Sequence, residues 1–254
     1  MDAILFDMDD TLYDQAQPLA CAVRKVVGEL PGVTADELYK ASRRHSGEVF
    51  AAYAAGGRPT DAIYVRRMRQ TMADFGVKVS DDVALRLQRA YTARNPEAMR
   101  LSPAMVRTLD LCRAHARRGL GIVTNGTLDR QMDKWRELGL SRWIPRERVF
   151  VSDELGVAKP DPAIFLHSLG AMGASADASL FVGDAYQIDV VGAHAAGIRV
   201  AWLDRRRNGM PKGADWPAGG LDRPHGRGAR LAHGAASGRE GLALAGCDGP
   251  RGRG

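Results

Sequence analysis

The sequence predicts an α/β fold: a doubly wound, Rossmann-like parallel sheet core with a small α-helical cap domain inserted after the first strand. Five short apolar runs have the composition of strands, and helical patterns separate the later runs. A long stretch with no convincing strand lies between the first run and the second. Strands and helices that alternate at this spacing are typical of a parallel sheet with helices on both faces.

Each apolar run ends at a polar residue or a glycine turn, as strands of a parallel sheet commonly do. The predicted strands are Ala3–Phe6, Leu120–Val123, Val149–Val151, Leu180–Val182 and Arg199–Leu203. The predicted helices of the core are Pro103–Arg118, Leu128–Leu138, Pro162–Leu169 and Asp189–Ala196. This order of elements predicts one sheet built from both ends of the chain's first 208 residues.

The stretch from about Gln15 to Glu97 contains only amphipathic helical segments. These segments are Leu19–Leu30, Thr34–Ala55, Thr60–Phe75 and Ser80–Arg94. Thr34 stands three residues before Glu37, which is the spacing of a capping box. We therefore expect residues 1–14 and 98–208 to form the catalytic core and residues 15–97 to form a helical cap over the end of the sheet.

The net charge of +6 comes from the end of the chain. Residues 205–254 hold ten Lys or Arg and four Asp or Glu, which leaves 26 basic and 26 acidic residues in 1–204. A basic nucleic-acid-binding face on the folded body is therefore not indicated. Residues 209–254 form a Gly/Arg-rich tail that buries too little apolar surface to offset its ordering entropy, so we expect it to be disordered.

Membrane and secretory segments are not indicated either. No apolar run approaches the roughly 18 residues that a membrane span needs. Asp2 stands where a signal peptide would carry positive charge, and the apolar run behind it is short. We expect a cytoplasmic protein without a membrane partner, as a monomer or a homodimer.

Polar motifs follow four of the predicted strands. They are Asp7-Met8-Asp9-Asp10-Thr11, Thr124-Asn125-Gly126, Lys159-Pro160-Asp161-Pro162, and Gly183-Asp184 with Asp189 five residues on. In open α/β sheets the site lies outside the carboxyl ends of the strands, near a switch in strand order. The four motifs are therefore expected to project into one crevice.

Several carboxylates in one crevice repel one another unless a cation offsets their charge. Magnesium suits such a site because it takes oxygen ligands and few carboxylates. We expect Asp7, Asp184 and the backbone carbonyl of Asp9 to bind it. Asp189 is interpreted either as a group that orients waters or Lys159, or as the cap of the next helix.

A magnesium ion beside hydroxyl, amide and ammonium donors suits a phosphoryl group, whose oxygens carry negative charge. We expect Thr124, the Asn125-Gly126 turn and Lys159 to bind the phosphate. Asp7 can attack phosphorus to give an aspartyl-phosphate, with Thr124 and Lys159 assisting. Asp9 can protonate the leaving oxygen and later deprotonate water.

The motifs resemble the signature motifs of the haloacid dehalogenase-like hydrolases over roughly residues 3 to 204. The segments that carry the resemblance are Phe6–Tyr13, Ile122–Gly126, Gly156–Pro160, and Val182–Asp184 with Asp189. The resemblance implies that Asp7 is the nucleophile, that Asp9 is the acid and base, and that the metal is magnesium. It also implies a small helical cap that closes over the site.

The resemblance also indicates which of the family's reactions to expect from this chain. Dehalogenases of the family lack an aspartate two positions after the nucleophile, whereas this chain has Asp9. Phosphomutases often carry Gly-Val where this chain has Asp10-Thr11. The run Ser152–Pro160 is similar to members that act on nucleoside 5′-monophosphates and other small phosphorylated metabolites.

The sequence therefore predicts a magnesium-dependent phosphatase of a small phosphorylated metabolite, with a nucleoside 5′-monophosphate as the first candidate. A phosphomutase or phosphotransferase is the enzymatic alternative, and a nucleic-acid binder acting through the basic tail is the alternative from another class. The charged run Arg205-Arg206-Arg207 is interpreted as a solvated turn.

The end of the chain departs from the family pattern. Members of the family normally finish with one more short strand and a helix, and nothing of this kind follows Trp216. Because GC-rich DNA read out of frame yields Gly/Arg/Ala/Pro-rich sequence, we hypothesise that the reading frame slips near Gly219-Gly220.

Overall fold

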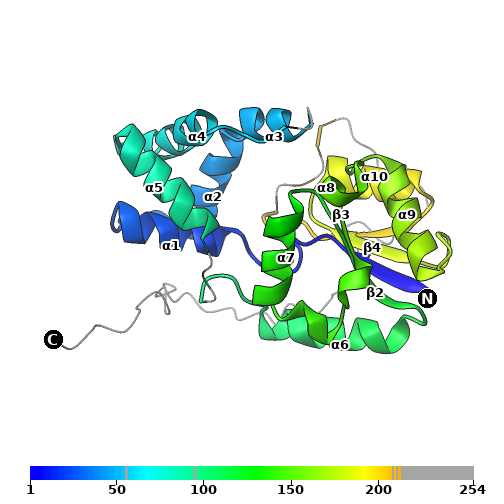
Figure 1. The fold of residues 1–254 in the computed structure, drawn as a ribbon. Helices are drawn as coiled ribbons and strands as arrows, with labels where there is room; N and C mark the ends of the chain where they lie inside the picture. The colour runs from blue at the N-terminus through cyan, green and yellow to red at the C-terminus, as the bar shows by residue number, and fades with distance from the viewer. Residues whose placement is uncertain (55–56, 94, 96, 208, 210, 213–254) are drawn as a thin grey trace. The chain divides into compact units, whose positions relative to one another are not determined.

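The computed structural model describes residues 1–54, 57–93, 95, 97–207, 209 and 211–212 (Figure 1). The predicted disordered tail, with its hypothetical frame slip, therefore lies almost wholly outside the described residues. The described chain divides into two compact units. One unit combines Met1–Asp14 with the described residues from Arg100 onward, and the other comprises Gln15–Met99.

The first unit is built on a parallel sheet of five strands in the order β3-β2-β1-β4-β5. The strands are β1 (Ala3–Phe6), β2 (Gly119–Thr124), β3 (Val149–Val151), β4 (Leu180–Gly183) and β5 (Arg199–Trp202). The predicted α/β fold class is thereby confirmed, and each predicted strand lies within one or two residues of its observed bounds.

Helices cover both faces of this sheet, with α6 and α7 on one side and α9 and α10 on the other (Figure 1). Their bounds are α6 (Pro103–His115), α7 (Leu128–Glu137), α9 (Pro162–Met172) and α10 (Val191–Ala195). A short helix α8 (Ser152–Leu155) follows β3, and a π-helical turn (Tyr186–Val190) precedes α10. The short helix was not predicted, because four residues carry no helical periodicity.

The core beneath α9 and α10 is aromatic and aliphatic. Phe165 of α9 meets Phe181 of β4 edge to face at 5.0 Å between ring centroids, and both side chains are fully buried. Leu5 of β1 and Val200 of β5 belong to the same cluster. Because helices bury both faces of the sheet, the strands are continuous apolar runs in the sequence and do not alternate between apolar and polar residues.

The strand order places a topological switch beside β1. The chain adds β2 and β3 on one side of β1 and then crosses to add β4 and β5 on the other. Asp7 follows β1 and Asp184 follows β4, its parallel neighbour. In open α/β sheets, ligands bind in the crevice outside the carboxyl ends of the strands at such a switch.

In the second unit, the regular elements among the described residues are all helices. They are α1 (Ala16–Val26), α2 (Ala35–Arg44), α3 (Gly47–Ala54), α4 (Asp61–Ala73) and α5 (Asp81–Thr92). The apolar faces of α1, α2, α4 and α5 share one core that includes Leu19, Leu38, Met68 and Leu87. The capping box expected at Thr34 is present, since the Glu37 amide donates to the Thr34 hydroxyl and the Thr34 amide donates to the Glu37 carboxylate.

One predicted helix is divided in two, and others shift at their ends, as where Leu19–Leu30 is observed as Ala16–Val26. The segment expected as Thr34–Ala55 is two helices, because α2 ends at Arg44 and α3 begins at Gly47. The Ser46 hydroxyl donates to the backbone carbonyl of Ser42, a local contact that competes with regular helical pairing. None of the helices in the described part of the chain is long and apolar enough to cross a membrane.

Candidate active site

The nucleophile predicted from the sequence is paired with the predicted lysine. The Lys159 ammonium donates to Asp7 Oδ1 at 2.6 Å and to Asp189 Oδ1 at 2.7 Å. The Lys159 and Asp189 side chains are 2% and 1% exposed, so the pairing is shielded from solvent. Burial disfavours the charge of Lys159, but Asp189 and Asp7 outweigh burial and raise its pKa. Lys159 therefore holds a fixed positive charge at the end of β1.

The carboxylates around Lys159 are crowded. Burial raises the pKa of Asp7 to about 7; repulsion from Asp189 and Asp9 adds to this rise, and Lys159 opposes it. Burial also raises the pKa of Asp184 to about 9, with further repulsion from Asp7 and Asp189. One lysine is thus too little positive charge for this set of carboxylates, and a bound cation would offset the remainder.

The donor set fits a metal ion. Asp7, Asp184 and Asp189 each offer one carboxylate oxygen, and these oxygens lie within 4.8 Å of one another. Both oxygens of Asp189 accept hydrogen bonds from protein groups, from Lys159 and from the Ala185 amide. Asp7 and Asp184 are therefore the better placed ligands, and hard oxygen donors of this kind suit a divalent cation.

The Asp189 side chain packs closely against the backbone of Gly183. A Cβ atom added at Gly183 would lie 2.5 Å from Asp189 Oδ2, so only glycine leaves room for this carboxylate. Of the two interpretations left open for Asp189, the structure shows the contact with Lys159. Its second oxygen accepts from Ala185 at the start of the π-helical turn and not from the helix that follows.

The second motif positions the loop that carries Lys159. The Asn125 side chain pairs with the Lys159 backbone twice: its amide donates to the Lys159 carbonyl and its oxygen accepts from the Lys159 amide, both at 2.9 Å. The Gly126 amide donates to the Ser152 hydroxyl at 3.0 Å. In this state the Asn125 side chain holds Lys159 in place, whereas the sequence suggested that this turn contacts the phosphate. Thr124 is buried at the end of β2.

Asp9 lies among donors that the sequence did not identify. The Lys134 ammonium of α7 contacts Asp9 Oδ1 and Oδ2 at 2.7 and 2.6 Å, and the Tyr13 hydroxyl donates to Oδ1 at 2.6 Å. Burial would raise the pKa of Asp9, but Lys134 and Tyr13 outweigh burial and lower it. Asp9 is therefore held as a carboxylate, the form that can accept a proton.

The interpretation of residues 205–207 as a solvated turn is wrong for two of the three arginines. The Arg205 guanidinium donates to the backbone carbonyls of Asp10 and Thr11 at 2.8 and 3.0 Å. The Arg206 side chain is 7% exposed and bridges Asp10 and Asp14 at 2.7 and 2.6 Å. These contacts hold the loop of the first motif against the end of β5.

Arg206 is therefore expected to stabilise the first unit. Replacing Arg206 with Met should lower the free energy of unfolding by about 3 kcal/mol, because it removes the cation that compensates the buried Asp10 carboxylate. Such a loss corresponds to a fall of about 6–12 °C in the thermal midpoint. Scanning fluorimetry measures it, with exposed Arg207→Gln as the matched control. Equal midpoints for Arg206→Met and wild type would contradict this account.

The fold and the site define a class of protein: an α/β enzyme with a lysine-paired aspartate and further carboxylates at a switch in strand order. Residues 1–197 match the family of haloacid dehalogenase-like hydrolases. The chain belongs to this family of hydrolases, as its motifs indicated.

Proteins of known activity resemble the chain. A phosphoserine phosphatase of Thermus thermophilus is 30% identical over 229 residues, which cover 81% of this chain and 89% of that protein. A pyrimidine 5′-nucleotidase of Escherichia coli is 32% identical over 130 residues, which cover 50% of this chain and 56% of that protein. The crystal structure of a putative hydrolase of the family from Bacillus subtilis, bound to magnesium, shares the fold with a TM-score of 0.62 at 23% identity, covering 83% of this chain and 90% of that one.

Proposed function

We propose that this protein is a magnesium-dependent phosphomonoester hydrolase that acts through an aspartyl-phosphate on Asp7. The observation that carries the proposal is the ion pair between Asp7 and buried Lys159 beside Asp184, at the carboxyl ends of β1 and β4. An aspartate that is aligned by a lysine at this edge of the sheet suits in-line attack on a phosphoryl group.

Asp7 and Asp184 would hold the magnesium ion, together with the backbone carbonyl of Asp9. When bound, the ion neutralises charge on the phosphoryl oxygens and offsets the repulsion among the carboxylates. The raised pKa values of Asp7 and Asp184, which reflect burial and mutual repulsion, support the need of this site for a bound cation. Lys159 contributes a second, permanent positive charge in contact with Asp7.

In the first half of the reaction, a carboxylate oxygen of Asp7 attacks phosphorus and the ester P–O bond breaks. Asp9 enters this step protonated, with a proton taken up from solvent or regained from water in the preceding turnover, and gives it to the leaving oxygen, which departs as an alcohol. Lys159, with the Thr124 hydroxyl and the Asn125-Gly126 turn, would bind the transferring phosphoryl oxygens. Asn125 contributes by fixing the backbone of Lys159.

In the second half, water attacks the phosphorus atom of the aspartyl-phosphate. Asp9 takes the proton of this water, the P–O bond to Asp7 breaks, and inorganic phosphate leaves. The net reaction is ester plus water to alcohol plus phosphate. The carboxylate state in which Lys134 and Tyr13 hold Asp9 suits this second step.

The substrate is proposed to be a small phosphorylated metabolite. The relatives named above act on phosphoserine and on pyrimidine nucleotides, so phosphoserine joins nucleoside 5′-monophosphates as a first candidate. We propose that the helical residues 15–97 act as the cap that selects among them and excludes water during transfer. Small polar substrates of this kind fit the proposed location in the cytoplasm.

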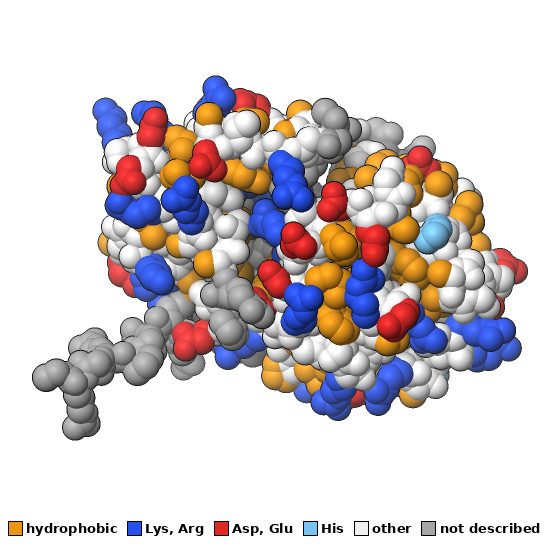
Figure 2. All heavy atoms as spheres, in the orientation of Figure 1, with side chains coloured by type: hydrophobic (Ala, Val, Ile, Leu, Met, Phe, Trp, Pro, Cys, Tyr) orange, Lys and Arg blue, Asp and Glu red, His pale blue; other side chains and the backbone are white. Residues whose placement is uncertain are grey.

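A role in nucleic-acid binding has less support. Figure 2 shows acidic and basic side chains interspersed over the described residues in view, and no extensive basic patch among them. The basic tail would have to act by itself. Deleting residues 216–254 and finding undiminished, salt-dependent DNA binding would exclude the tail as its cause.

The experiment that tests the proposal is phosphate release from a panel of phosphorylated metabolites, with magnesium or with EDTA. The panel includes nucleoside 5′-monophosphates, phosphoserine and p-nitrophenyl phosphate. Release that needs magnesium is expected, and EDTA should reduce it at least about 10²-fold, since the ion offsets charge in the transition state. Equal release in EDTA would contradict the role of the metal.

The same panel separates a hydrolase from a mutase. A phosphomutase or phosphotransferase needs an acceptor hydroxyl, so phosphate release without any acceptor argues against that alternative. Transfer to an added sugar without release of inorganic phosphate would favour it instead.

A further inference from the structure

Two residues contact the Asp9 carboxylate in the site described above, Tyr13 and Lys134. Lys134 belongs to α7, a helix that lies outside the four motifs. Its ammonium lies within hydrogen-bonding distance of both carboxylate oxygens of Asp9. The Lys134 and Asp9 side chains are 17% and 24% exposed, so water screens the pair only in part. The Tyr13 hydroxyl also donates to Oδ1, so two donor groups restrain the direction of the carboxylate.

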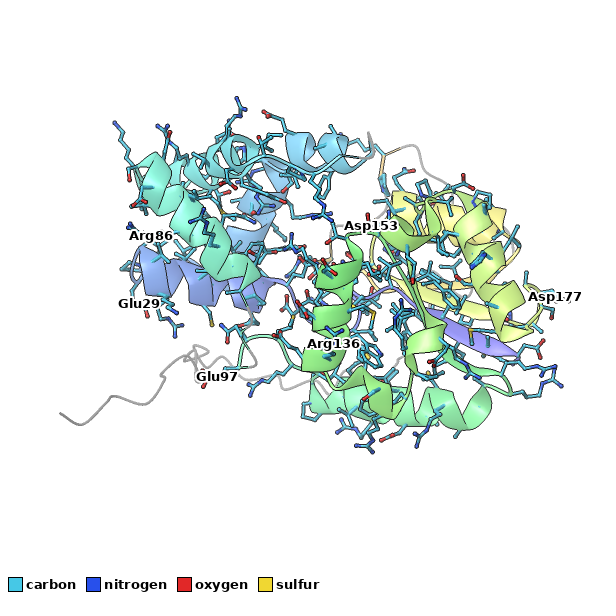
Figure 3. The ribbon with its side chains drawn as sticks, viewed as in Figure 1. Glu29, Arg86, Glu97, Arg136, Asp153 and Asp177 are labelled. Carbon is cyan, nitrogen blue, oxygen red and sulfur yellow. The ribbon has the colours of Figure 1, made fainter. Side chains whose placement is uncertain are left out.

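The helix that carries Lys134 is tied to the second motif. At its start, the Leu128 amide donates to Asp153 Oδ2 at 3.0 Å, and Figure 3 shows Asp153 beside this end of α7. One turn on, the Gln131 side chain donates to the Asn125 carbonyl at 3.2 Å. Lys134 follows Gln131 by three residues on the same face, and its ammonium lies 3.5 Å from Gln131 Oε1.

A chain of contacts thus runs from the turn that holds Lys159 to Asp9. Asn125 pairs with the Lys159 backbone, Gln131 contacts Asn125, and Lys134 contacts Asp9. The distance between Lys159 and the Asp9 carboxylate is therefore set by α7 and not only by the loop after β1.

Electrostatics explain why Asp9 needs such a partner. Asp9 and Asp7 repel each other, so an unpaired Asp9 would turn away from the nucleophile toward solvent. The Lys134 ammonium, in contact with both oxygens of Asp9, compensates this repulsion.

We propose that Lys134 is a positioning residue that directs the Asp9 carboxylate toward the leaving oxygen of the substrate. The inference rests on the proposed function, in which Asp9 exchanges the proton. Lys134 does not take part in the bond changes itself. Its loss should therefore lower kcat/KM, which reports transfer of the phosphoryl group to Asp7, only as far as the leaving group depends on protonation by Asp9.

The test compares kcat/KM for two esters, glycerol 3-phosphate and p-nitrophenyl phosphate, in wild type and Lys134→Met. The alcohol from the first ester is a poor leaving group that needs a proton, whereas p-nitrophenolate leaves without one. We expect Lys134→Met to lose on the order of 10²-fold on glycerol 3-phosphate and less than about threefold on p-nitrophenyl phosphate. A merely structural role would lower both by the same factor.

Three further variants make the comparison specific. Asp9→Asn should show the same dependence on the leaving group, and the double variant should lose no more than Asp9→Asn, because the two residues act as a unit. Lys134→Arg should recover part of the loss, since it retains the charge. Arg136→Met is the matched control on the same helix, because exposed Arg136 pairs with Asp133 and should leave both rates unchanged (Figure 3).

Equal losses on both esters, or additive losses in the double variant, would overturn the role of Lys134. A circular dichroism spectrum and thermal midpoint close to wild type establish that each variant is folded. If wild type releases no phosphate from these esters or from any member of the panel above, the proposed function fails. If wild type is active and Lys134→Met loses activity uniformly, only the inference about Lys134 fails.

Discussion

Replacing Asp7 with Asn is expected to reduce kcat by about 10⁴-fold or more on every ester that the wild type hydrolyses. Asn is nearly the same size as Asp, and its oxygen can still accept a hydrogen bond from Lys159, so the fold should persist. An amide oxygen is a far weaker nucleophile than a carboxylate and forms no stable phosphoenzyme. The loss therefore reports on the chemistry of residue 7.

Asp7→Glu is the matched variant, because it retains the charge and moves the carboxylate by one methylene. Its activity should also be low, since in-line attack depends on the position of the oxygen. The measurement is phosphate release under saturating substrate and magnesium. Retention of a tenth or more of the wild-type kcat by folded Asp7→Asn would contradict the role of Asp7 as nucleophile.

Replacing Lys159 with Met is expected to reduce kcat by about 10²–10³-fold, the cost of removing one preorganised charge from a transition state. The lysine compensates two buried carboxylates, Asp7 and Asp189, so its removal leaves both without this cation. With Lys159 absent, the pKa of Asp7 should rise further and the fraction of ionised nucleophile at neutral pH should fall.

Lys159→Arg distinguishes charge from geometry. The guanidinium retains the positive charge but does not fit a buried space shaped for an ammonium, so only partial activity is expected. Steady-state kinetics and a thermal midpoint are measured on the same preparations. Near wild-type kcat in folded Lys159→Met would show that this charge does not act in the reaction.

The sequence predicted the strands and the meeting of the motifs for one physical reason. Strands that are buried on both faces are short apolar runs, and their carboxyl ends meet at one edge of a parallel sheet. Asp7, Lys159 and Asp184 follow three such runs, and the structure brings them together. The roles assigned to them remain proposals that the experiments above address.

Residues that lie outside the motifs were missed because their partners are distant in the sequence. Arg206 stands in a run of three arginines, which is typical of a solvated turn, and its partners Asp10 and Asp14 are 196 and 192 residues away. No local pattern distinguishes Arg206 from exposed Arg207. Only the fold shows which of the arginines is buried.

The position of Lys134 on its helix was only a weak indication that it belongs to the site. It lies three residues after buried Gln131 on α7, and therefore on the inward side of the helix, whereas neighbouring Arg136 is exposed. Helical lysines are usually solvated, so the pattern did not single it out. The double contact of Asn125 with Lys159 is likewise invisible in the sequence, because the two loops meet only in the folded sheet.

The central claim is that a phosphoryl group is transferred to Asp7, and trapping it is the most direct measurement. Wild-type protein is mixed with magnesium and p-nitrophenyl phosphate, quenched in acid within milliseconds, digested and mapped by mass spectrometry. The account predicts one phosphoryl group on the peptide that carries Asp7, and none in Asp7→Asn. Turnover with an unmodified Asp7 peptide, or with the phosphoryl group on another residue, would contradict it.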